Sequence, residues 1–258
     1  MAAIGRCALC QTPGVELLES HVLPKWAYRR IVAYVAGARN PVEVGSGIAV
    51  RTSRQVKVNL LCAQCEDRFG RRENYASTIV VQADGAFPAL DLANPQRVTQ
   101  DIVVATMGHL DIDQLTYFAI SVFWRADVAQ IDPIVHLGPA REAIRRYLLE
   151  LDPLPQPVEL VVQLIEREPT TPRIDRIVIF PASHPESDPP LHDFVICGIW
   201  FRLYVGELNG PEHFAGSFPR NRGARIIGAQ TVLRQSDIAD EVQTSTARGA
   251  LGRDQSKR

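Results

Sequence analysis

Three observations predict an α+β fold for this chain of 258 residues. Two Cys-x-x-Cys pairs, at 7–10 and 62–65, enclose a mixed N-terminal segment. Mainly helical patterns follow up to residue 150, and strand-like runs separated by proline-rich turns then continue to residue 207. We therefore expect three parts, which are an N-terminal unit over 1–75, a mixed helical and antiparallel β region over 76–234, and a tail over 235–258.

The cysteine pairs predict a structural zinc site. A two-residue gap lets one turn present both sulfurs to one metal, and Zn²⁺ takes four thiolates in a tetrahedron. In a reducing compartment, pairs this far apart in sequence are explained better by zinc than by disulfides. We expect one Zn²⁺ on Cys7, Cys10, Cys62 and Cys65. One alternative is two independent redox or incidental pairs. Another is a zinc-containing redox sensor that uses both Cys-x-x-Cys pairs.

Between the cysteine pairs, the sequence predicts one short helix and then extended chain. WAYRRIVAYVAG (26–37) has a helical pattern, and glycine, proline and asparagine punctuate the stretch that follows it. IAVRTSRQVKVNLL (48–61) is typical of extended chain. EDRFGRRENYASTIV (66–80) predicts a helix that begins near the last cysteine, although Gly70 weakens this pattern.

The region after residue 76 should contain a buried helix, a second helix and several strands. DIDQLTYFAISVFWRADV (111–128) is apolar around most of its circumference, and Asp111 is a suitable cap. GPAREAIRRYLLEL (138–151) has one apolar face. The strands are expected at VELVVQLIE, RIDRIVIFP and FVICGIWFRLYVG, the last with Cys197 as a small buried apolar residue. The tail over 235–258 is polar and aperiodic, so we expect it to be disordered.

Charge is distributed unevenly along the chain. Residues 1–75 hold eleven Lys and Arg against six Asp and Glu, although the whole chain has a formal charge of −1. A positive surface attracts phosphate backbones, and a solvated basic face is the alternative interpretation. The longest near-apolar runs, 31–38 and 117–124, are shorter than the roughly 20 residues of a membrane span. With no signal-like N-terminus, we expect a cytoplasmic protein with no membrane partner.

The order of motifs in residues 1–75 resembles that of a known family. Cys-x-x-Cys is followed by Ser20-His21-Val-Leu-Pro, and then by Asn59-Leu-Leu-Cys-x-x-Cys with the acidic Glu66 directly after it. This order is similar to that of the zinc-stapled HNH endonucleases, whose nuclease core is a ββα-metal finger. The resemblance covers less than a third of the chain. It implies an HNH-like finger ahead of the helical and antiparallel β region.

The resemblance also implies site residues. His21 matches the general base that activates water, and Asn59 matches the residue that orients it. Glu66 stands where the family commonly has a histidine ligand for the catalytic ion, and Glu73 would share its helical face. Ser20 stands where the family commonly has Asp, Glu or His as a metal ligand. Candidate phosphate-binding residues are Lys25, Arg29, Arg30, Arg68, Arg71 and Arg72.

These residues lead to the expectation of an endonuclease that hydrolyses DNA with Mg²⁺ or Mn²⁺, with RNA left open as a substrate. By analogy alone, such an enzyme would suit bacterial defence. The alternative is a non-catalytic zinc-stapled module that binds nucleic acid or serves as an adaptor. Glu66 and Glu73 would then be partners of Arg68, Arg71 and Arg72 on an exposed helix. A protein partner or a homodimer through the C-terminal region is left open.

Overall fold

The structure is a computed structural model of the chain. It describes the backbone of residues 3–33, 42–45, 48–51, 55–82, 84–93, 96–97, 103–106, 110–131, 135–165, 178–208 and 226–230. The tail predicted over 235–258 lies outside these residues, as does the first part of the predicted strand RIDRIVIFP.

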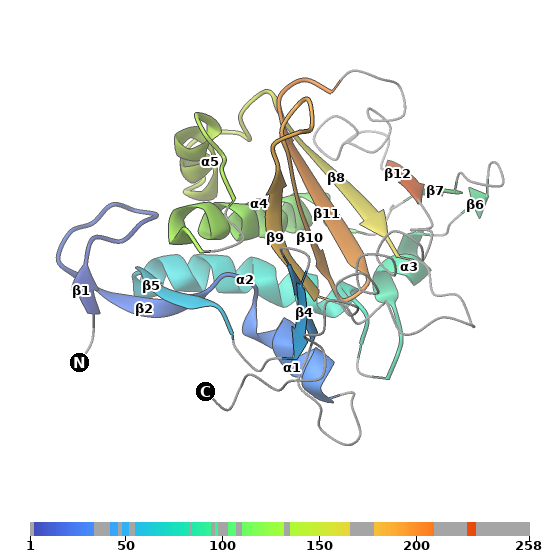
Figure 1. The fold of residues 1–258 in the computed structure, drawn as a ribbon, viewed down its shortest axis with the longest axis horizontal. Helices are drawn as coiled ribbons and strands as arrows, with labels where there is room; N and C mark the ends of the chain where they lie inside the picture. Colours follow the sequence, from blue (N-terminus) through green and yellow to red (C-terminus); the bar gives the residue numbers. More distant parts are fainter. Residues whose placement is uncertain are drawn as a thin grey trace.

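The N-terminal part contains a three-stranded antiparallel sheet followed by a long helix (Figure 1). Its strands have the order β1-β2-β5. Helix α1 and the hairpin β3-β4 lie between β2 and β5 in sequence, and α2 follows β5 directly. The bounds are β1 (Ala3–Gly5), β2 (Val15–His21), α1 (Lys25–Ala33), β3 (Val42–Gly45), β4 (Ile48–Arg51), β5 (Lys57–Leu61) and α2 (Ala63–Ile79).

The rest of the chain adds helices, a four-stranded antiparallel sheet and a smaller sheet. The large sheet has the order β8-β11-β10-β9, and the small one has the order β12-β7-β6. The bounds are α3 (Pro88–Ala93), β6 (Gln96–Arg97), β7 (Val103–Thr106), α4 (Ile112–Ala129), α5 (Ala140–Leu148), β8 (Val158–Leu164), β9 (Val178–His184), β10 (Leu191–Ile196), β11 (Ile199–Val205) and β12 (Ile226–Gln230). The predicted α+β class is therefore confirmed.

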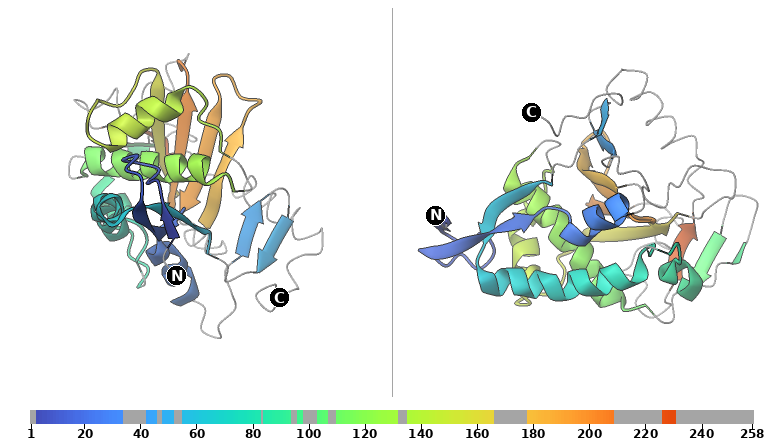
Figure 2. Two further views of the ribbon diagram at one scale, coloured as in Figure 1. Left: turned by 90° about the vertical axis from the view of Figure 1, so that its left-hand side faces the viewer. Right: turned by 90° about the horizontal axis from the view of Figure 1, so that it is seen from below.

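Helix α4 is the centre of the core, as its apolar circumference predicts. It lies between α2 and the large sheet (Figure 2). Asp111 caps it by accepting a hydrogen bond from the backbone N of Gln114 at 3.0 Å. Phe118 meets the ring of Phe201 on the sheet at 5.8 Å between centroids. On the other side, Trp124 meets Phe69 of α2 at 6.2 Å, so one apolar core joins both parts of the chain.

The boundary predicted near residue 75 falls inside α2, which continues from Ala63 to Ile79 without interruption at Gly70. Buried apolar side chains before and after residue 75 belong to one cluster. Among the described residues, no helix has the length and apolar character needed to cross a membrane.

The prediction of a single strand over 194–206 is wrong. Cys197 and Gly198 form a two-residue turn with positive φ values of 44° and 90°, and they separate β10 from β11. Glycine favours this turn, because positive φ is free of steric cost only without a side chain. The turn is packed into the core, where the Cys197 carbonyl accepts from the backbone N of Val81 at 3.0 Å. Because apolar residues flank the turn on both sides, the sequence pattern predicted one continuous strand.

Candidate metal centre

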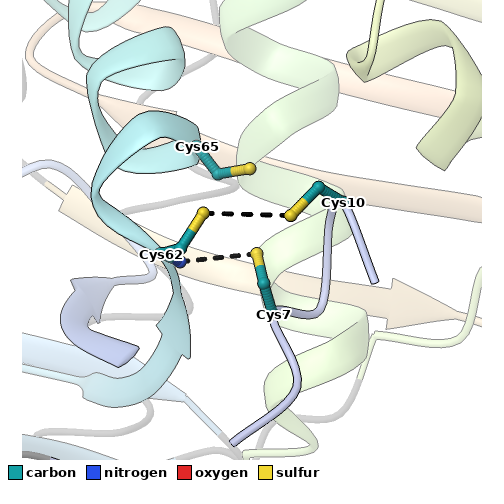
Figure 3. Close-up of side chains that lie close together, drawn as sticks. All are labelled: Cys7, Cys10, Cys62 and Cys65. Atoms are coloured by element: carbon teal, nitrogen blue, oxygen red, sulfur yellow. Dashed lines mark hydrogen bonds between the residues drawn. The ribbon is translucent and has the colours of Figure 1, made fainter. Parts of the chain in front are cut away.

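The four predicted zinc cysteines come together in space (Figure 3). The sulfurs of Cys7, Cys10, Cys62 and Cys65 all lie within 4.8 Å of one another, and those of Cys10 and Cys62 are 3.8 Å apart. Four sulfurs about 2.3 Å from one tetrahedral zinc would lie about 3.8 Å from one another. The donor set therefore fits a structural zinc ion. Among the described residues, it is the only group of three or more His, Cys, Asp or Glu at such distances.

Backbone hydrogen bonds shape the two cysteine turns. The first turn is closed by bonds from Cys7 N to Thr12 O at 3.0 Å and from Gln11 N to Cys7 O at 2.9 Å. In the second, Cys62 precedes α2, and its carbonyl accepts from Cys65 N at 3.0 Å. The backbone N of Cys62 also points to the sulfur of Cys7 at 3.4 Å. Each Cys-x-x-Cys pair is thus preformed with its sulfurs directed at the other.

The protein environment acts differently on the individual thiols. Burial raises the pKa of Cys7 and of Cys65. Burial also acts to raise the pKa of Cys10, but hydrogen bonds with Thr12, Cys7 and Cys65 outweigh it and lower that pKa to about 6. Four thiolates this close repel one another, and the charge of a bound cation offsets that repulsion and so favours the deprotonated form. The cluster is therefore suited to a metal more than to free thiols.

Helix α5 supports the first cysteine turn from the C-terminal part of the chain. Arg145 donates from Nη1 to the carbonyl of Leu9, whose side chain is buried. Glu142 holds the same guanidinium in place through an ion pair at 2.7 Å. Sequence reasoning missed Arg145, because its contact spans 136 positions.

A second group of polar side chains lies at the end of β2. Ser20 is 2% exposed, and its hydroxyl donates to Oε1 of Glu66 in the first turn of α2. The next residue, His21, pairs with Lys57 of β5, and its Nε2 lies 2.9 Å from Oε1 of Gln55. The structure thus brings together Ser20 and Glu66, the two positions for which the resemblance implies metal ligands.

The two other predicted catalytic residues have different surroundings. Asn59 is exposed on β5 and pairs across the sheet with Glu19, while Gln55 is the residue that contacts the His21 ring. Glu73 lies on nearly the same helical face as Glu66, about 20° away, and forms an ion pair with Arg125 at 2.7 Å. The same guanidinium nitrogen donates to the carbonyl of His21 at 2.7 Å. Sequence reasoning also missed Arg125.

Three of the six basic residues predicted to bind phosphate make contacts within the protein. Arg30 donates to the carbonyls of Ser77 and Val81 near the end of α2, at 2.6 and 3.0 Å. Arg68 and Arg72 both pair with Glu150. They lie about 120–160° around α2 from Glu66. The other three, Lys25, Arg29 and Arg71, are exposed.

No family model, no curated protein and no solved structure matches this chain.

Proposed function

We propose that the end of β2 and the first turn of α2 form the active site of an HNH-type endonuclease that hydrolyses DNA phosphodiester bonds. The observation that carries the proposal is the hydrogen bond from Ser20 to Glu66 directly beside His21. It supports the proposal because the positions of the implied ion ligands meet next to the implied base. The cysteine cluster would then hold the end of β2 and the first turn of α2 together, since Cys65 immediately precedes Glu66.

His21 would act as the general base on the attacking water. The amide oxygen of Gln55 accepts hydrogen bonds and has no proton to donate, so His21 Nε2 carries the proton of the neutral ring. Nδ1 then keeps a lone pair that is able to take a proton from water. Gln55 would hold the ring in the way the resemblance implies for Asn59.

Glu66 would be the principal protein ligand of a divalent ion. Carboxylate oxygen is the ligand type that Mg²⁺ and Mn²⁺ take, and water completes the coordination when few protein ligands are present. Glu73 was predicted as a second ligand, but one of its oxygens is occupied by Arg125. A bound Mg²⁺ or Mn²⁺ would supply charge that binds the scissile phosphate and stabilises the leaving oxygen.

The test is nicking of supercoiled plasmid DNA with Mg²⁺ or Mn²⁺. We expect nicking by the zinc-loaded wild type and its loss in His21→Ala and in Glu66→Gln, with zinc content unchanged. The matched control is His184→Ala, which removes a partly exposed histidine of β9. Absence of nicking by the wild type, or equal nicking by wild type and His21→Ala, would overturn the nuclease.

A non-catalytic zinc-stapled module is the second candidate, and the internal pairing of charges favours it. Glu73 is bonded to Arg125, and Arg68 and Arg72 are bonded to Glu150, so these groups are less available to an ion or phosphate. Such a module would bind DNA without cutting it, through the exposed residues. The double variant Lys25→Ala/Arg29→Ala tests this in fluorescence anisotropy. The slope of log binding constant against log salt concentration should become less steep by about 0.9 for each lost phosphate contact. Unchanged binding would exclude this surface.

A further inference from the structure

We propose that Arg125 is a positioning residue of this active site, holding the end of β2 against α2 from within helix α4. The inference rests on the proposed function and extends it into the C-terminal part of the chain. Its basis is that the Arg125 guanidinium contacts both the backbone of His21 and the carboxylate of Glu73. Glu73 lies about two helical turns after Glu66, the proposed ion ligand.

The contacts of Arg125 connect three elements. Its Nη1 donates to His21 O in β2 at 2.7 Å and to Oε1 of Glu73 in α2 at 2.7 Å. Its Nε donates to Ser121 O, one turn earlier in α4, at 3.3 Å. The ring of Phe69 lies 5.3 Å from the guanidinium carbon. Because the guanidinium is planar and rigid, these contacts fix the direction in which β2 ends.

The burial of Arg125 is costly, which argues for a role other than stability. The residue is 1% exposed, and its Nη2 has no hydrogen-bond partner among the described residues. A buried donor without a partner costs about 1–3 kcal/mol, and more if charged. Replacing a buried ion pair with apolar residues of similar size is often neutral or stabilising. A purely structural role would therefore be served as well by apolar residues at both positions of the pair.

The same contacts assign a role to Glu73. Its carboxylate supplies the countercharge that makes burial of Arg125 tolerable. Ion binding is then left to Glu66, whose hydrogen bond is with the neutral Ser20. The active site consequently includes α4, so that the segment over 1–75 alone does not contain every residue that positions it.

The experiment compares Arg125→Met, Arg125→Lys and the control Arg146→Met, all in the full-length zinc-loaded protein. Arg146 pairs with Asp152 on the exposed side of α5 and is a matched Arg→Met change outside the site. We expect Arg125→Met to lower kcat for nicking about 10- to 100-fold with little change in KM, since displaced catalytic groups slow chemistry more than binding. Arg125→Lys should recover part of kcat, and the control should match the wild type.

A second readout separates this inference from the nuclease itself. Ring signals of ¹³C-labelled histidines report the surroundings of His21 whether or not DNA is cut. Arg125→Met should shift the His21 signals and leave those of His184 in place, and a wild type that does not nick would then refute only the nuclease. If Arg125→Met does not fold, Glu73→Gln replaces it and should shift the same signals. Unchanged His21 signals, or an unchanged kcat in a nicking protein, would overturn the positioning role.

Discussion

Ser20 Oγ donates a hydrogen bond to Oε1 of Glu66, although the two residues are 46 positions apart. Ser20 reaches this position because β2 pairs with β5 in a register that sets it opposite Val58. Glu66 reaches it because α2 begins directly after β5, at the second cysteine pair. The contact is thus set by strand register and by the position of the cysteines.

This contact predicts that Ser20→Asp strengthens a divalent-ion site. Two carboxylates side by side repel without an ion and share one when it is present. In ion-free buffer, the variant should unfold at a lower temperature than the wild type. Mn²⁺ should raise the unfolding midpoint of the variant by more than that of the wild type. A difference of about 1 kcal/mol corresponds to roughly 2–4 °C for a chain of this size. Calorimetry checks this, with the neutral Ser20→Asn as control. An equal Mn²⁺ response in both variants would contradict it.

The cysteine cluster predicts one zinc ion per chain that is needed for stability. Zinc sites of this type bind with about 10–16 kcal/mol in peptides, and that energy is available to folding. We expect Cys62→Ser to lose zinc and to unfold at a midpoint lower by roughly 10 °C or more. Elemental analysis and thermal unfolding measure the two effects. Cys197→Ala should keep its zinc, because Cys197 lies in the turn after β10. Full zinc content in Cys62→Ser would refute the site.

The buried His192 predicts a loss of stability in mild acid. Burial lowers its pKa from 6.5 to about 4, so the folded state resists protonation that the unfolded state accepts. Its contribution is complete above pH 6.5 and falls as the pH drops toward 4. Each tenfold change in protonation is worth about 1.4 kcal/mol, which gives a loss of roughly 3 kcal/mol. Between pH 6.5 and pH 4, the urea midpoint of His192→Asn should fall less than that of the wild type. The amide oxygen of the asparagine is still able to accept a hydrogen bond from Ser183.

His184 supplies a control of opposite sign on the same pair of strands. Its hydrogen bond with Asp193 raises its pKa above 6.5. The stabilisation is therefore complete below pH 6.5 and disappears as the pH rises through the folded-state value. His184→Gln should lose more stability at pH 6 than at pH 8. If the His184 and His192 variants show the same pH dependence of stability, the opposite signs expected for the two histidines are wrong.

Two glycines predict opposite effects of alanine. Gly70 lies inside α2, and a Cβ there would have no neighbour within 4 Å, so Gly70→Ala should stabilise by about 1 kcal/mol. At Gly198, φ is +90° and a Cβ would lie 2.8 Å from Val81 Cγ2. Gly198→Ala should therefore destabilise by about 2–4 kcal/mol. Gly14→Ala, at φ +68° in open space, isolates the backbone cost of about 1 kcal/mol. Chemical denaturation measures all three.

Local patterns were sufficient to predict most of the elements. The apolar circumference of 111–128 predicted the buried helix α4 and its Asp111 cap, and the pattern of 66–80 predicted most of α2. The hairpin turn at Cys197 and Gly198 was missed, because the apolar run continues through it and Gly198 is its one mark in the sequence. Periodicity reports which face of an element is buried, whereas a turn depends on backbone angles at two residues.

The sequence by itself determined which four cysteines come together as a possible zinc site, because the two-residue spacing within each pair is enough to aim two sulfurs at one metal. Only the tertiary structure decided which groups surround His21. Gln55 contacts its ring from the segment before β5, and Arg125 of α4 donates to its carbonyl. Glu73 of α2 pairs with Arg125. Such contacts leave no periodic trace, because each depends on the packing of one helix or strand against another. The structure likewise decided that Arg68 and Arg72 pair with Glu150, which follows α5 and is distant from them in sequence.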